Sequence, residues 1–236
     1  MSLITIFLNS YIFGMLSNLL GGIIGFIGNI KSEEKISEIT GFTAGITTSI
    51  ICFEMLVEAF GITTKYIVIV YILLGIGFVK IIDILIYKIK KNSNNKSALL
   101  IITAMSAHNI TEGIAIGSAF GLSNKHGLSL LIAIMIHNIP EGMIISIASK
   151  KQENRFKPIF NACNIIGMFL GIGAILGNSL GNINNSLVAP CLSVSAGAML
   201  YIVACELIPG MNNIKNNNKI GIIYTIGFLI GCIMCT

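Results

Sequence analysis

Two histidines and two glutamates recur at one spacing in the middle of apolar stretches of the chain. The segment HNITEG at 108–113 and the segment HNIPEG at 137–142 match at an offset of 29 residues. In each segment a histidine stands four residues before a glutamate, and residues at that spacing share one face of a helix. Each segment therefore presents one imidazole and one carboxylate together. These four residues, called the quartet below, are His108, Glu112, His137 and Glu141.

The quartet offers two nitrogen ligands, two oxygen ligands and no thiolate. Such a set suits zinc, and it also suits ferrous iron or manganese. Two carboxylates balance the charge of one divalent ion, which offsets the cost of placing them in an apolar environment. A histidine must be neutral to bind a metal, so we expect acid to weaken binding. The sequence therefore predicts a divalent-metal site; a polar network that only ties two helices together is the alternative.

Other residues in the two segments repeat with the quartet. Asn109 and Asn138 each follow a histidine, so they can bind an adjacent ion or orient a glutamate; an amide bonded to a neighbouring helix is the alternative. Pro140 removes one backbone hydrogen bond and bends its helix. Thr111 holds the corresponding place in the first segment and can hydrogen-bond back to a carbonyl. A small-xxx-small run that favours close helix packing comprises Gly113, Gly117 and Gly121.

The composition indicates that these helices lie in a membrane. Hydrophobic residues make up 54% of the 236 residues and charged residues only 11%, whereas a soluble domain carries about a quarter charged residues. A spanning helix needs about 20 mostly apolar residues. Eight stretches qualify, and they are 3–28, 36–60, 64–88, 98–122, 126–149, 158–180, 187–209 and 219–236. No gap could hold a soluble domain, so we predict one all-α transmembrane domain over residues 1–236, with the lipid bilayer as its surroundings.

The basic residues set the expected orientation. Twelve of the 15 Lys and Arg residues lie in the first, third, fifth and seventh gaps, and only Lys65 and Lys125 lie in the other gaps. Positive charge concentrates on the cytoplasmic side of membrane proteins, so both termini are expected outside. The N-terminus lacks the positive start of a signal peptide, and we interpret it as the first spanning helix. His126 is interpreted as a solvated histidine in an outer loop.

A second repeat is weaker than the first. AGITTSIICFE at 44–54 pairs with AGAMLYIVACE at 196–206, at an offset of 152 residues. Together the two repeats predict that the first three helices are inverted onto the last three around a central pair, which is a transporter architecture. Glu54 and Glu206 end the two matched segments. We predict that both act as secondary residues that relay the ion on either side of the site; an interfacial role is the alternative.

These motifs resemble those of the ZIP family of zinc/iron-regulated transporter-like proteins, in a bacterial form. HNITEGIAIG, HNIPEG and SAGAMLYIVACELIP are each similar to a signature of that family, and the likeness covers essentially the whole chain. The resemblance implies uptake of zinc, iron, manganese or cadmium into the cytoplasm across a bacterial inner membrane. It implies one ion on the quartet and a second on Asn109, Asn138 and the shared carboxylates. It also implies alternating access, in which a four-helix bundle slides against the rest, and frequent homodimers.

One position departs from the family pattern, and some classes of protein are excluded. Bacterial relatives often carry a glutamate before Pro and Gly in the helix over 158–180, and Asn164 stands where we expect it. Intramembrane metalloproteases need an HExxH helix, which this chain lacks, and membrane di-iron enzymes need more clustered histidines than the three present. We therefore expect no enzyme. A metal-selective channel and a metal exporter remain alternatives. No nucleic-acid partner is expected.

Overall fold

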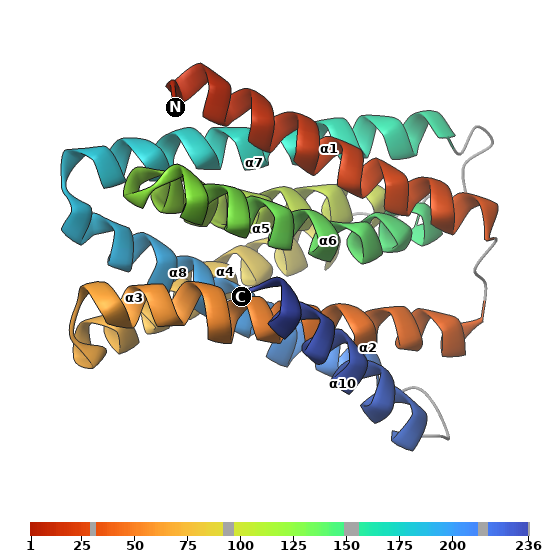
Figure 1. Ribbon diagram of the computed structural model, residues 1–236. Coiled ribbons are helices and arrows are strands. Elements are labelled where there is room, and N and C mark those ends of the chain that lie inside the picture. The colour runs from red at the N-terminus through yellow and green to blue at the C-terminus, as the bar shows by residue number, and fades with distance from the viewer. Residues whose placement is uncertain (29–31, 92–96, 149–155, 212–216, 236) are drawn as a thin grey trace.

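The structure is a computed structural model that describes residues 1–28, 32–91, 97–148, 156–211 and 217–235. Every regular element in these ranges is helical, which confirms the predicted all-α class for the described part of the chain. The helices lie side by side along a common direction (Figure 1). In chain order they are α1 (Leu3–Ile27), α2 (Glu33–Ile50), η1 (Ile51–Met55), α3 (Leu56–Ile62), α4 (Lys65–Lys91), α5 (Ser97–Leu122), α6 (Asn124–Ala148), α7 (Phe156–Ile183), η3 (Asn185–Leu187), α8 (Val188–Ile202), η4 (Val203–Leu207), α9 (Ile208–Met211) and α10 (Asn217–Met234).

Many of these helices have the length and composition of membrane spans. Six described segments are long and apolar enough to cross a membrane, and they are Leu3–Ile27, Glu33–Ile62, Lys65–Leu85, Asn124–Ser146, Phe156–Ile183 and Val188–Met211. Asn218–Met234 is a shorter apolar helix. α5 is not among these six segments.

Local sequence explains where several helices begin and end. Ser32 caps α2, since its hydroxyl accepts a hydrogen bond from the Lys35 amide at 3.2 Å. The turn between α3 and α4 needs only residues 63–64, and the turn between α5 and α6 needs only Ser123. The gaps expected from the sequence were therefore too long. His126 lies in the first turn of α6, so its placement in a loop was wrong.

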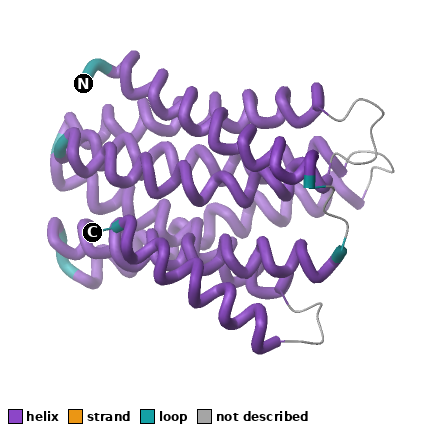
Figure 2. The backbone as a smooth tube through the Cα atoms, turned by 45° about the vertical axis from the view of Figure 1, so that its right-hand side comes forward, coloured by secondary structure: helices purple, strands orange, loops and turns teal. Residues whose placement is uncertain are grey.

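The connections between helices divide between two ends of the molecule. The α3–α4, α5–α6 and α7–α8 turns lie at one end, together with both termini, and the end of α1 and the beginning of α2 lie at the opposite end (Figure 1 and Figure 2). Half of the twelve basic residues of the four charged gaps cannot be placed at either end, because they lie outside the described residues: Lys31, Lys96, Lys150, Lys151, Arg155 and Lys215.

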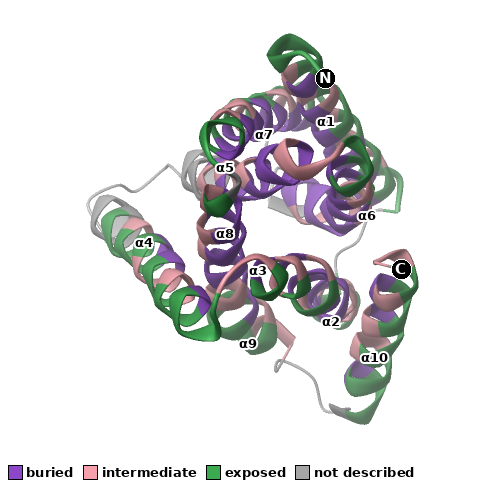
Figure 3. Cartoon of the chain, turned by 60° about the vertical axis from the view of Figure 1, so that its left-hand side comes forward, coloured by how far each residue is buried: buried purple, intermediate pink, exposed green. Residues whose placement is uncertain are grey.

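The helices form two groups (Figure 3). α1, α5, α6 and α7 pack on one another and are called the site bundle. The remaining helices form the flanking group, in which α2 packs on α10 and α4 packs on α8. Within the site bundle, a Cβ atom added at Gly113 or Gly117 would overlap a backbone carbonyl of α7. The predicted role of this glycine run in close packing is therefore confirmed at these two positions.

Two π-helical turns interrupt helices of the flanking group. η1 separates α2 from α3 and contains Glu54, and η4 separates α8 from α9 and contains Glu206. A π-helical turn inserts an extra residue into a helix and is frequent at functional sites. Both membrane carboxylates of the weaker repeat thus lie where their helices are locally widened.

Candidate metal centre

The side chains of the quartet converge where α5 meets α6. The Nε2 atom of His108 lies 3.0 Å from Oε1 of Glu112 and 3.2 Å from Oε1 of Glu141. The Nε2 atom of His137 lies 3.2 Å and 3.1 Å from the same two oxygens. Each quartet residue offers one ligand atom, and all four atoms lie within 4.8 Å of one another. The two helices therefore contribute equally to one compact group of atoms that could hold a metal ion.

The separations within the quartet are close to those expected around a tetrahedral ion. Zinc bonds of about 2.0–2.1 Å place two ligands of a tetrahedron about 3.3 Å apart. The four nitrogen-to-oxygen distances are 3.0–3.2 Å. A dication would therefore require only small outward shifts of the four side chains.

The quartet is removed from solvent. Glu112 is 0% exposed, His137 is 1%, His108 is 6% and Glu141 is 8%. Among the described residues, Oε2 of Glu112 has no hydrogen-bond partner, and Oε1 has the two imidazole nitrogens beside it. A buried carboxylate oxygen without such a partner is costly, and a dication bound by two carboxylates would neutralise both. The environment therefore favours a cation.

The two amides of the repeat are also buried. The Asn109 side chain donates to the Met105 carbonyl at 2.9 Å, and its Oδ1 has no partner within the described part of the chain. Neither side-chain amide atom of Asn138 has a partner there. The amide oxygens of both residues thus remain free to bind a ligand, and Thr111 donates back to the His108 carbonyl at 2.7 Å, as expected.

Asn164, the residue at the family's glutamate position, pairs with α1. Its Oδ1 accepts a hydrogen bond from the Tyr11 hydroxyl at 2.8 Å. Asn164 is partly buried on α7. The structure thus gives Asn164 a partner in the site bundle other than the quartet.

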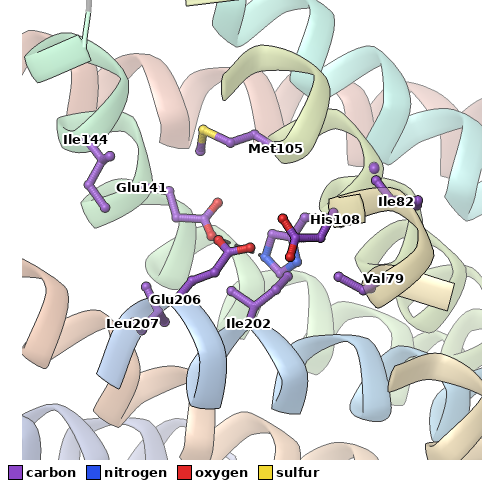
Figure 4. Close-up of a pocket in the computed structure, with 11 residues that line it drawn as sticks. Val79, Ile82, Met105, His108, Glu141, Ile144, Ile202, Glu206 and Leu207 are labelled. Carbon is purple, nitrogen blue, oxygen red and sulfur yellow. Dashed lines mark ion pairs between the residues drawn. The ribbon is translucent and has the colours of Figure 1, made fainter. Parts of the chain in front are cut away.

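A cavity of about 260 Å³ reaches the quartet from one side, where His108 and Glu141 line it. Glu206 lines the same cavity and points toward the Glu141 carboxylate (Figure 4). Asp83, near the end of α4, also lines it and accepts a hydrogen bond from the Tyr201 hydroxyl at 3.0 Å. Sequence reasoning missed Asp83, although a lone carboxylate in an apolar helix was a signal that could have found it.

A second cavity, of about 230 Å³, lies toward the end of the molecule that holds the turns. Glu54 and Glu58 line it with His126, whose Nε2 lies 3.6 Å from Oε2 of Glu58. Leu130 also lines this cavity, and Ile134, one helical turn closer to His137, is fully buried. Glu54 and Glu206 therefore line different cavities, and apolar side chains separate the quartet from the one that Glu54 lines.

Thr47 on α2 is a neighbour of the quartet that sequence reasoning missed. Its hydroxyl oxygen lies 2.8 Å from Nδ1 of His137, and both residues are buried. Ninety positions separate the two residues along the chain. No local pattern marks Thr47, because three other threonines of α2 have the same chemistry.

The comparison with protein families is consistent with this geometry. A family model described as ZIP Zinc transporter matches residues 88–236, well over half of the chain, and this range includes the whole quartet. No curated protein compared with the chain matches it. On the strength of the family match, the chain belongs to the ZIP zinc transporter family.

Proposed function

We infer from membership in this family that the protein transports divalent metal ions across a membrane, a role distinct from that of an enzyme. We propose that the quartet binds the transported ion in the middle of the membrane, with zinc as the best substrate and Fe²⁺, Mn²⁺ and Cd²⁺ as further substrates. The observation that carries this proposal is the convergence of two imidazoles and two carboxylates within 4.8 Å of one another. A buried N₂O₂ set of this size suits zinc without binding it as tightly as thiolates do.

Asn109 and Asn138 are proposed to bind a second ion beside the first, sharing the carboxylates of the quartet. Their free amide oxygens support this role. An amide oxygen cancels no charge, so two dications would bring four positive charges against two negative ones. The second ion is therefore proposed to bind weakly. Asn164 is a possible further ligand, and its bond to Tyr11 would have to break for it to turn toward the ion.

The proposed path runs through the two cavities. The cavity lined by Glu206 lies toward the end of the molecule where α4 finishes and α5 begins, which the charge pattern assigns to the cytoplasm. The cavity lined by Glu54 lies at the opposite end. An ion would enter past Glu54, bind the quartet and leave past Glu206 into the cytoplasm. Apolar packing between Glu54 and the quartet makes this a conformation open only on the cytoplasmic side.

We propose eight spans arranged as inverted repeats, and close glycine contacts support this arrangement. Glycines at equivalent positions of the two repeats pack against helices that are also equivalent in the proposed repeat. A Cβ atom added at Gly45 would overlap the Tyr224 carbonyl of α10, and one added at Gly197, offset by 152, would overlap the Ile72 carbonyl of α4. The π-helical turns η1 and η4 are also 152 residues apart.

The stronger repeat has the same kind of support. A Cβ atom added at Gly142 would overlap the Asn18 carbonyl of α1, and one added at Gly113, offset by 29, would overlap the Leu170 carbonyl of α7. Asn18 and Leu170 are themselves 152 residues apart. The central pair of helices is therefore proposed to lie across a pseudo-twofold axis, with the whole of 1–236 as one transport domain in a bacterial inner membrane, both termini outside. The homodimer implied by the family resemblance remains a prediction.

Zinc uptake into proteoliposomes that contain the purified protein tests the proposed function. Wild-type protein is expected to give saturable uptake, and Glu141→Ala is expected to abolish it while the protein stays folded in the membrane. Glu33→Ala is the matched control for Glu141→Ala, since Glu33 is exposed in the first turn of α2 and lies outside the quartet. Full uptake by the Glu141→Ala variant would refute the role of the quartet.

The same vesicles separate the alternatives. A channel would give flux that follows voltage without saturation, and an exporter would move zinc only from the cytoplasmic side. Because the protein inserts into the vesicles in both orientations, molecules of one orientation are inactivated from one side before uptake is measured. Saturable movement toward the cytoplasmic side favours the proposed importer.

A further inference from the structure

The hydroxyl of Thr47 lies behind the ring of His137, on the side away from the carboxylates. Thr47 Oγ1 is 2.8 Å from the Thr43 carbonyl oxygen and 2.8 Å from Nδ1 of His137. Nε2, the other ring nitrogen of His137, faces the oxygens of Glu112 and Glu141. Thr47 therefore contacts the ring nitrogen that does not face the site.

The hydrogen-bond partners of Thr47 fix which nitrogen of His137 carries the proton. A carbonyl only accepts, so the single hydroxyl hydrogen of Thr47 is donated to Thr43. Thr47 Oγ1 must then accept from His137, which places the ring hydrogen on Nδ1. A neutral imidazole has one N–H, so Nε2 keeps its lone pair. That lone pair is directed at the oxygens with which it would share a metal ion.

We propose that Thr47 is a positioning residue of the metal site, which holds His137 in the Nδ1–H tautomer so that Nε2 can bind the transported ion. This inference rests on the proposed function. A hydrogen bond to the second nitrogen of a ligating histidine fixes both the tautomer and the ring orientation, and its loss commonly weakens metal binding about 10-fold to 100-fold.

The bond between Thr47 and His137 also crosses between the two helix groups. Thr47 belongs to α2 of the flanking group, and His137 belongs to α6 of the site bundle. A slide of the site bundle along the flanking group would separate the two residues while all four ligands stay together on α5 and α6. The affinity of the site would then depend on the position of the bundle, being highest where Thr47 reaches His137.

The other histidine of the quartet lacks such a partner. Nδ1 of His108 has no hydrogen-bond partner among the residues that the structure describes. The residue of α8 that corresponds to Thr47 at the 152-residue offset is Met199, which has no hydroxyl group. The two histidines are therefore unequal: His137 is held from the flanking group, and His108 is free to turn toward the cavity that it lines.

Zinc binding to purified full-length variants, measured by titration calorimetry, tests the role of Thr47. Thr47→Val keeps the shape and removes the hydroxyl, so the dissociation constant should rise about 10-fold to 100-fold. Thr47→Ser keeps the hydroxyl and should stay within about threefold of wild type. Thr43→Val is the matched control, because the Thr43 hydroxyl donates only to the Ile39 carbonyl, at 2.8 Å. In transport assays, Thr47→Val should raise KM without a matching fall in kcat.

Two outcomes overturn the inference. Zinc affinity of Thr47→Val equal to that of wild type would remove the need for the hydroxyl, and an equal loss in Thr47→Ser would show a packing role. Wild type that binds no zinc would instead refute the proposed function, and this inference with it.

A measurement on wild type covers the case in which Thr47→Val does not fold. Nitrogen NMR of ¹⁵N-histidine-labelled, cadmium-loaded protein should show a protonated Nδ1 and a cadmium-bound Nε2 for His137, assigned by comparison with the His137→Gln variant. Cadmium bound through Nδ1 would overturn the inference.

Discussion

The Nε2 atom of His137 and the Oε1 atom of Glu112 lie 3.2 Å apart, although the two residues belong to different helices. The sequence spacing alone brings His137 to Glu141, one turn along α6. Contact with Glu112 requires that α5 and α6 cross with the quartet at one level in the membrane. A single ion would therefore tie the two helices together, and the predictions below concern that ion, its surroundings and the packing that supports it.

Acid is expected to weaken zinc binding. Both imidazoles must be neutral to bind the ion, so protons compete with zinc for the same nitrogens. Once both histidines protonate in the free protein, the affinity should fall roughly up to 100-fold per pH unit, since one or two protons are displaced per ion. Titration calorimetry in buffers of different ionisation enthalpy counts the released protons. Affinity that is constant between pH 7 and pH 5 would contradict histidine ligation.

The wild-type chain is expected to hold one tightly bound ion, because only two carboxylates lie in the quartet. Asn164→Glu adds a third carboxylate to the site bundle and should raise the metal content of purified protein from near one toward two ions per chain. Native mass spectrometry measures this content. Asn182→Glu, the same change at an exposed position of α7, is the control and should add none. Wild type that already holds two ions, with no gain in Asn164→Glu, would refute the charge argument.

Single cysteines test the orientation of the chain. In a background without the six native cysteines, Asn184→Cys should react with a membrane-impermeant thiol reagent in intact cells. Asn184 lies in the exposed turn between α7 and α8. Glu33→Cys, at the opposite end of the molecule, should react only after the cells are opened. The reverse pattern would place the termini in the cytoplasm.

Gly117→Ala is expected to destabilise the site bundle. The added methyl group would overlap the Ala174 carbonyl of α7, so α5 and α7 must separate. Overpacking of this kind costs about 1–3 kcal/mol, and the Tm of the detergent-purified protein should fall. Gly77→Ala is the matched control, because a Cβ at Gly77 meets nothing within 4 Å. Equal Tm values for Gly117→Ala and wild type would show that the helices do not pack this closely.

The two motifs allowed much of the site to be predicted from the sequence. Residues four apart on a helix face the same way whatever surrounds the helix, so the pairing of His108 with Glu112 and of His137 with Glu141 is a local property. Their recurrence in antiparallel helices predicted that the pairs meet, and the structure brings all four ligand atoms together. The apolar composition likewise predicted the all-α class, because a backbone that spans a membrane has few alternatives to the helix.

Helix ends were less predictable than helix positions. The polar residues Lys125 and His126 favoured a loop between two apolar runs, yet they belong to the first turn of α6. A polar residue near a membrane surface can continue a helix as readily as end it, since water satisfies the free backbone groups in either case. Composition therefore marks the membrane boundary rather than the last helical residue.

By itself, then, the sequence determined the four quartet residues and their pairing along each helix, because both depend on residue type and helical period. Only the tertiary structure decided which side chains surround them. Thr47 reaches His137 from 90 positions away, and Asn164 pairs with Tyr11 of α1. Neither contact follows from a local period, because each depends on how two helices are rotated and shifted against one another, and that geometry is set by packing along their whole length.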